Sequence, residues 1–132
     1  MKWLALALRI IVGGGFIAFG SMYFLNLMPK EQPPGIPEMA LRLGEGFGST
    51  GWMTVVKVCE LVGGLLVLSG RLTPLGLVIL VPVTVNIAIW DALVMKYSMP
   101  PIGTVLLALE IVLMVLYRSH FRPLLDTKSQ IG

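Results

Sequence analysis

The sequence has little charge: Asp, Glu, Lys and Arg make up 13% of its 132 residues, while 56% are hydrophobic. A soluble domain averages about 25% charged residues. The chain also has one cysteine, Cys59, and one histidine, His120. These counts exclude a disulfide within the chain and a haem held by two of its histidines. We therefore expect an all-α integral membrane protein that forms one domain over residues 1–132.

Recognisable catalytic motifs are also missing. The sequence has no glycine-rich phosphate loop, no spacing typical of metal ligands and no Ser, His and Asp set. We expect no metal site, and the sequence leaves open whether the chain belongs to an enzyme. The net charge of +3 is small, and the basic residues sit mostly at the ends of apolar runs. This pattern favours orientation in a lipid bilayer over nucleic-acid binding.

Four apolar runs have about the 20 residues that a membrane span requires. They predict a four-transmembrane-helix antiparallel bundle with helices over residues 3–28, 52–70, 73–94 and 102–117. The first run is too long for the apolar part of a signal peptide, so we interpret it as an uncleaved helix. Prolines and glycines predict a long outer loop over residues 29–51, with a short interfacial helix over residues 36–43. A polar tail covers residues 118–132.

The basic residues predict the orientation of the bundle. With four spans, one side carries five of them: Lys2, Arg71, Arg118, Arg122 and Lys128. The other side carries Lys30, Arg42 and Lys96. We therefore expect a multi-pass protein of the bacterial plasma (inner) membrane with both termini and the tail in the cytoplasm.

Polar residues inside the apolar runs define the candidate site. A charge at the centre of a span costs roughly 3 kcal/mol, so Glu60, in the second run, should have partners on other helices. We expect an intramembrane polar cluster of Arg9, Glu60, Glu110 and Asn86, with Arg9 bonded to Glu60, Glu110 or both. Two alternatives remain open. Arg9 extends to the membrane surface, or Glu60 pairs with Lys57 of its own helix.

Glycines and a proline predict how the helices meet. Arg9, Gly13, Phe16, Gly20 and Tyr23 share one face of the first helix, because they follow at steps of three and four. The two glycines allow close approach of another backbone.

Pro82 predicts a kink in the third run that opens a cavity toward the outer leaflet. We expect Asn86 to lie near the opening, and the candidate lining residues are Tyr23, Lys57, Trp90 and Asp91.

Several of these segments resemble the DoxX family of small four-helix membrane proteins. Arg9-xxx-Gly13-xx-Phe16-xxx-Gly20 resembles its first-helix signature, and Glu60-Leu-Val-Gly-Gly-Leu-Leu followed by Ser69-Gly70-Arg71 resembles its second. The stretch from Arg71-Leu-Thr-Pro-Leu-Gly to Asn86 is similar to a DoxX-like subgroup, as is the ending Leu109-Glu110…Tyr117-Arg118…Phe121-Arg122-Pro123. Two positions depart from the pattern: Tyr23, where many members carry Lys, and Asp91, where the subgroup often has His. If those positions carry the family's chemistry, it is altered or absent here.

The resemblance implies a membrane subunit of a quinone-linked or oxidative-stress oxidoreductase complex, with a soluble or membrane redox partner. Quinone or lipid is then the expected bound molecule, because the chain supplies no redox group of its own. Two alternatives are a membrane assembly or interaction factor and a binder of a lipid or amphipathic small molecule in an intramembrane pocket. The sequence also leaves a homo-oligomer open.

Overall fold

The computed structural model describes residues 1–128 and 130–132, which contain helices and no strands. The elements are α1 (Lys2–Phe24), α2 (Glu38–Ser49), α3 (Trp52–Ser69), α4 (Thr73–Ile89), the π-helical turn η1 (Trp90–Val94), α5 (Ile102–Leu116), α6 (Arg118–Phe121) and the 3-10 turn η2 (Arg122–Leu125). Within the described residues, three helical segments are long and apolar enough to cross a membrane: Lys2–Phe24, Trp52–Ser69 and Thr73–Val94. There are up to four if Ile102–Leu116 and Arg118–Leu125 count as one bent span. The predicted all-α membrane class is confirmed at this level.

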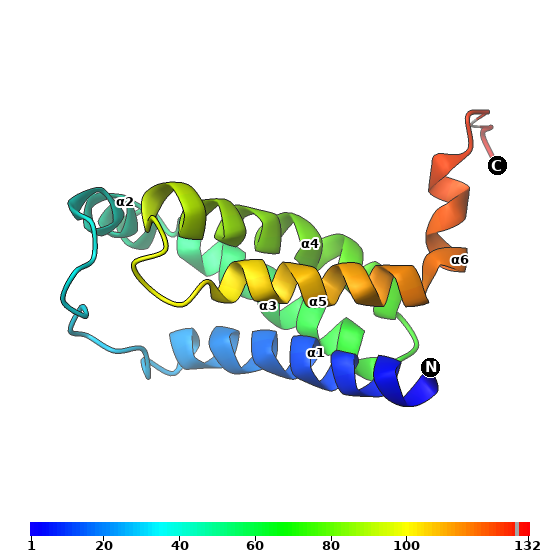
Figure 1. The fold of residues 1–132 in the computed structure, drawn as a ribbon, viewed down its shortest axis with the longest axis horizontal. Coiled ribbons are helices and arrows are strands. Elements are labelled where there is room, and N and C mark those ends of the chain that lie inside the picture. The colour runs from blue at the N-terminus through cyan, green and yellow to red at the C-terminus, as the bar shows by residue number, and fades with distance from the viewer. Residues whose placement is uncertain (129) are drawn as a thin grey trace.

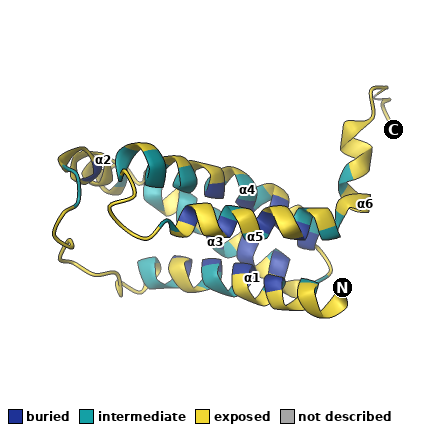
Figure 2. Ribbon diagram, in the orientation of Figure 1, coloured by how far each residue is buried: buried dark blue, intermediate teal, exposed yellow. Residues whose placement is uncertain are grey.

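The helices α1, α3, α4 and α5 lie side by side around one core (Figure 1). Helix α3 packs against α1 and α4, and α5 packs against α4 and α1, which closes the group. The buried residues are concentrated where these helices face one another (Figure 2) and include Phe16, Val67, Leu77, Leu80 and Leu113. Many large apolar side chains remain exposed on the outer faces, as expected of helices that contact lipid.

Glycines determine how closely these helices approach. A Cβ atom built at Gly13 would lie 2.8 Å from the carbonyl oxygen of Gly64, and one built at Gly64 would lie 2.9 Å from that of Gly13. The same holds between α3 and α4, where a Cβ at Gly76 would lie 2.8 Å from the oxygen of Gly63. The backbones therefore touch, which is how helices commonly associate in lipid.

The first helix ends at Phe24, four residues earlier than the predicted end at residue 28. Asn26 adopts a left-handed conformation with φ of 55°, which asparagine tolerates better than most residues. The amide of Leu27 then donates to the carbonyl of Met22 at 2.9 Å, and the amide of Asn26 donates to that of Tyr23 at 3.3 Å. This pair of bonds is the Schellman arrangement that terminates helices. The apolar run therefore extends past the end of the helix.

The connection between α1 and α3 contains a longer helix than expected. Helix α2 covers Glu38–Ser49 rather than residues 36–43, and its glycines at 44, 46 and 48 are helical. Phe47 stacks on Trp52 with ring centroids 6.2 Å apart and lies 5.9 Å from the ring of Trp90. This aromatic contact fixes α2 over the ends of α3 and α4 that lie away from the chain termini (Figure 1).

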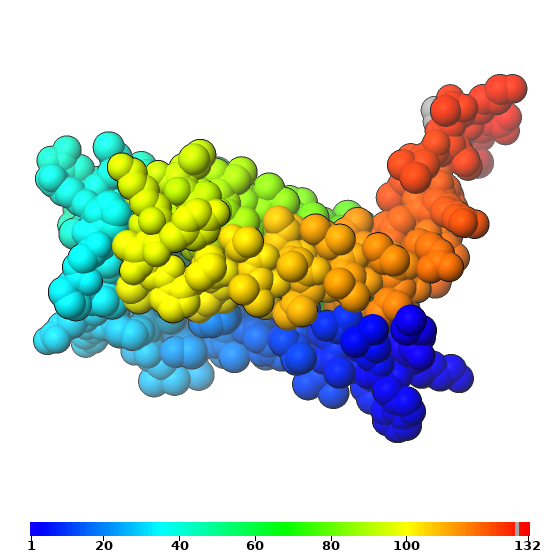
Figure 3. Space-filling view, in the orientation of Figure 1, coloured from blue at the N-terminus to red at the C-terminus, as the bar shows by residue number. Residues whose placement is uncertain are grey.

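The C-terminal residues leave the helical body at a sharp angle. The segment Arg118–Leu125 is bent by 83° from α5. Figure 3 shows this tail standing away from the body at the end where the N-terminus also lies. The predicted polar tail over residues 118–132 is therefore partly helical.

Candidate functional site

Arg9 does not make the expected bond to Glu60 or Glu110. Its guanidinium group donates instead to two backbone carbonyl oxygens at the end of α3, from Nε to Val67 at 3.2 Å and from Nη2 to Leu68 at 3.0 Å. The prediction of a polar cluster centred on Arg9 is therefore wrong.

The reason lies in the end of α3, whose last carbonyls have no partner within the helix. Such carbonyls are bonded by side chains or by water. Ser69 donates to Leu66, Thr73 donates to Val67, and Arg9 donates to Val67 and Leu68. A cation is also favoured at the negative end of the helix dipole. The guanidinium group of Arg9 therefore donates to these carbonyls and not to the carboxylates of Glu60 or Glu110.

Gly70 provides the space for this contact, which leads to a prediction. Gly70 has φ of 77°, and a Cβ there would lie 2.7 Å from Cζ of Arg9. Gly51 has φ of 76° with nothing within 4 Å. Gly51→Ala should lose roughly 1–2 kcal/mol of stability from backbone strain alone. Gly70→Ala should lose about 1 kcal/mol more, because it also displaces Arg9.

Thermal or denaturant unfolding in detergent measures both changes. Both alanine changes are then repeated in an Arg9→Leu background, which removes the contact between residue 70 and Arg9. The extra loss of stability for Gly70→Ala should vanish there, and the loss for Gly51→Ala should be unchanged. Equal losses for the two alanine variants in the wild-type background would show that Arg9 does not hold the end of α3.

Glu60 pairs with Lys57, which is the alternative that the sequence left open. Nζ of Lys57 donates to Oε2 of Glu60 at 3.0 Å and to Oε1 at 3.2 Å. The Glu60 side chain is 2% exposed and that of Lys57 is 13% exposed. Both residues lie on α3, three positions apart, so the charge is compensated within one helix.

Glu110 is completely buried and has a partner that sequence reasoning missed. Its Oε1 lies 2.8 Å from Oγ1 of Thr84, which also lies 2.9 Å from the carbonyl of Leu80. No described residue bonds to the other oxygen, Oε2. The missed signal is the face of α4: Thr84 follows Gly76 and Leu80 at steps of four, and the glycine marks a helix interface.

Asn86 and Trp90 line neither the pocket at the end of α1 nor the groove beside the C-terminal tail. Asn86 is exposed on the outer face of α4, where its amide donates to the carbonyl of Pro82 at 3.0 Å. The helix continues through Pro82 to Ile89. Asp91 accepts a bond from the amide of Gly103 at 2.9 Å, which caps α5. These residues satisfy local backbone groups.

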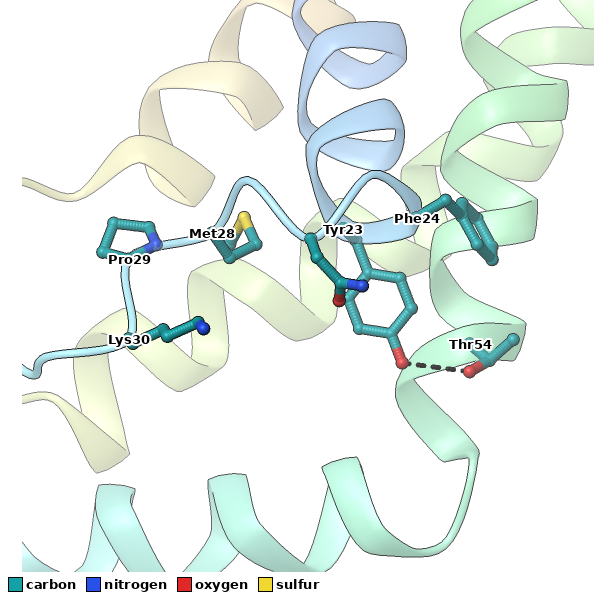
Figure 4. Close-up of a pocket in the computed structure, with 7 residues that line it drawn as sticks. Tyr23, Phe24, Met28, Pro29, Lys30 and Thr54 are labelled. Atoms are coloured by element: carbon teal, nitrogen blue, oxygen red, sulfur yellow. Dashed lines mark hydrogen bonds between the residues drawn. The ribbon is translucent and has the colours of Figure 1, made fainter.

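A pocket of about 740 Å³ lies instead at the end of α1 (Figure 4). It is lined by Tyr23, Phe24, Asn26, Met28, Pro29, Lys30 and Thr54. Tyr23 reaches from α1 to α3, where its hydroxyl oxygen lies 3.0 Å from that of Thr54. Of the four predicted lining residues, Tyr23 is in this pocket; Lys57, Trp90 and Asp91 are not among its lining residues.

We call this cavity the outer pocket, because it lies beside the predicted outer loop, and its lining is rich in hydrogen-bond donors. Tyr23 and Thr54 share one hydrogen bond but carry two hydroxyl protons, so one proton remains available to an acceptor. The amide of Asn26 and the ammonium group of Lys30 add further donors, and no lining residue is acidic. The pocket therefore suits a molecule that presents oxygen acceptors and apolar surface. No three His, Cys, Asp or Glu side chains among residues 1–128 and 130–132 are placed to hold a metal ion.

Comparison with known families matches residues 4–92 to the DoxX family model. The chain belongs to the DoxX family. Together with its apolar helices, this makes it a multi-pass membrane protein. No curated protein and no solved structure matches the chain.

The DoxX match covers α1 to α4 and most of η1, and therefore Arg9, the Lys57–Glu60 pair and the outer pocket. Glu110 and the C-terminal tail lie beyond it. Helix α5 nevertheless packs against both α4 and α1, so the residues beyond the match complete the core.

Proposed function

We propose that this DoxX protein binds an amphipathic molecule with a carbonyl-bearing head group, a quinone, in the outer pocket, as the membrane subunit of an oxidoreductase complex. The observation that carries the proposal is the Tyr23–Thr54 pair, which leaves one hydroxyl proton for an acceptor in a lining without acidic residues. The exposed ring of Phe24 beside this pair offers apolar surface to the rest of the molecule. Electron transfer itself requires a redox partner, soluble or in the membrane.

We further propose how the helices are arranged in the membrane. Helices α1, α3, α4 and α5 form four antiparallel spans of one domain over residues 1–132, and the connection containing α2 lies outside. Both termini face the cytoplasm of a bacterium, because five of the basic residues gather at that end of the bundle. This places the outer pocket at the external face of the plasma membrane, within reach of quinone head groups.

Quinone binding can be measured through the tryptophans, since Trp52 is two residues from Thr54. Titration of the purified protein in nanodiscs with a short-chain ubiquinone analogue should give saturable quenching. Tyr23→Phe and Thr54→Val should each weaken binding about fivefold, because the hydroxyl that remains loses the partner that orients its proton toward the acceptor. Tyr97→Phe is the matched control, since Tyr97 is exposed and outside the pocket. Quenching that rises linearly in all four proteins would mean partition into lipid alone.

An assembly or interaction factor is the second candidate, and the internal charge pairing favours it. Glu60 is compensated by Lys57 within α3, and Glu110 bonds to Thr84 between α5 and α4, so neither carboxyl group requires a ligand, and the second bond helps to fix helix register. In that case quinone binding is absent and the Tyr23 and Thr54 variants keep the function of the complex.

A further inference from the structure

A groove of about 450 Å³ lies in the elbow between α5 and the C-terminal tail, at the opposite end of the molecule from the outer pocket. Its walls are apolar side chains from both segments: Ile111, Met114, Val115, Phe121 and Leu125. Among the described residues, its polar lining consists of Arg118 and Arg122. The surface of the groove is apolar, so the two arginines line it with their aliphatic stems, and their charged ends belong to its rim.

These two arginines have no anionic partner within the part of the chain that the structure describes. The ion pairs found there are Arg42–Glu38 and Lys57–Glu60, and both are remote from the tail. The bond that Arg118 makes is a long one, 3.5 Å, to the carbonyl of Val115 near the end of α5. No acidic residue lines the groove. The positive charge at its rim is therefore available to an external anion.

The groove also lies at a defined depth. Ile111 and Val115 are 52% and 54% exposed on the outer face of α5, where a membrane protein contacts acyl chains. Arg118 follows directly after the end of this apolar helix, where the bilayer interface is expected. The tail then turns by 83° instead of continuing along α5. The apolar wall thus extends into the hydrocarbon, and the arginines lie at the level of the lipid head groups.

We propose that this elbow binds an anionic phospholipid of the leaflet at the C-terminal end of the bundle. An acyl chain packs along Ile111 and Val115, and the phosphate accepts hydrogen bonds from Arg118 and Arg122. Guanidinium groups suit this role because they bind phosphate through paired donors. Basic residues at a membrane surface also attract anionic lipid specifically. The bound lipid holds the tail against the end of α5.

Native mass spectrometry of the detergent-purified protein, exchanged with equal amounts of phosphatidylglycerol and phosphatidylcholine, measures which lipid stays bound. The wild type should retain phosphatidylglycerol in preference. The double variant Arg118→Gln/Arg122→Gln should lose on the order of tenfold in that preference. Arg71→Gln is the matched control, because Arg71 is exposed at the same end of the bundle but does not line the groove. It should behave as the wild type.

The apolar wall is tested by two neighbouring leucines. Leu125 lines the groove and Leu124 does not, although both are highly exposed, at 81% and 73%. Leu125→Ser should reduce phosphatidylglycerol retention, and Leu124→Ser should not. Both exposed sites can change without loss of folding, which circular dichroism checks. Soluble glycerophosphoglycerol should not compete, because it lacks acyl chains.

Three results would overturn the proposal. One is equal retention of the two lipids by the wild type. The second is a loss for Arg71→Gln as large as for the double variant, which indicates general surface charge. The third concerns a dimer that is crosslinked through cysteines placed in the groove. In this dimer a second copy of the chain occupies the groove, so a lipid preference equal to that of the monomer would show that the lipid binds elsewhere.

Discussion

Lys57→Leu should destabilise the protein by about 3 kcal/mol or more, because it leaves Glu60 buried without its cation. Glu60 is 2% exposed, and both of its carboxylate oxygens accept from Nζ of Lys57. The Arg9→Leu change should cost less, about 1.5–3 kcal/mol, since it removes hydrogen bonds to carbonyls but leaves no buried charge. Unfolding in mixed detergent micelles, followed by circular dichroism, measures the difference.

Variants of Glu60, the other member of the Lys57–Glu60 pair, provide the control. Glu60→Leu should cost less than Lys57→Leu, because Lys57 is partly exposed and its long side chain can reach water. The double variant Lys57→Leu/Glu60→Leu should recover most of the stability, as apolar replacements of buried pairs often do. The triple variant Arg9→Leu/Glu60→Leu/Glu110→Leu should not recover the stability that Arg9→Leu loses. A larger loss for Arg9→Leu than for Lys57→Leu would contradict this account.

The sequence predicted the bounds of three helices well, because the mean hydropathy of a run depends only on its composition. The helices expected over residues 52–70, 73–94 and 102–117 match α3, α4 with η1, and α5 to within about a residue. The face of α1 that carries Gly13 and Gly20 was also predicted, since helical spacing determines it. Both glycines lie at the contact with α3.

Partners across helices could not be predicted in the same way. Spacing places Arg9 on a face but does not give the register between two helices, and a shift of one turn moves a side chain by about 5 Å. Glu60 and Glu110 were the expected partners of Arg9, yet its guanidinium group bonds to the last carbonyls of α3. Those carbonyls belong to the backbone, so no residue type in the sequence indicates that they bind Arg9.

A large steric effect should come from Gly64→Leu, at about 3 kcal/mol or more. Even the Cβ of that side chain would lie 2.9 Å from the carbonyl oxygen of Gly13 and 3.2 Å from the amide nitrogen of Ile17. Both are backbone atoms, so no rotamer change relieves the contact, and α1 must separate from α3. Because α3 contacts both α1 and α4, the separation removes packing on which the whole helix group depends.

Gly14→Leu is the matched control, since Gly14 lies on the same helix as Gly13 and a Cβ there has nothing within 4 Å. This change should be nearly neutral, whereas Gly13→Leu should resemble Gly64→Leu because its Cβ meets the oxygen of Gly64 at 2.8 Å. The separated helices should also pull Arg9 from the end of α3. Arg9→Leu should then add little in the Gly64→Leu background, and a full additive loss would show that the glycine contact and the arginine contact act independently.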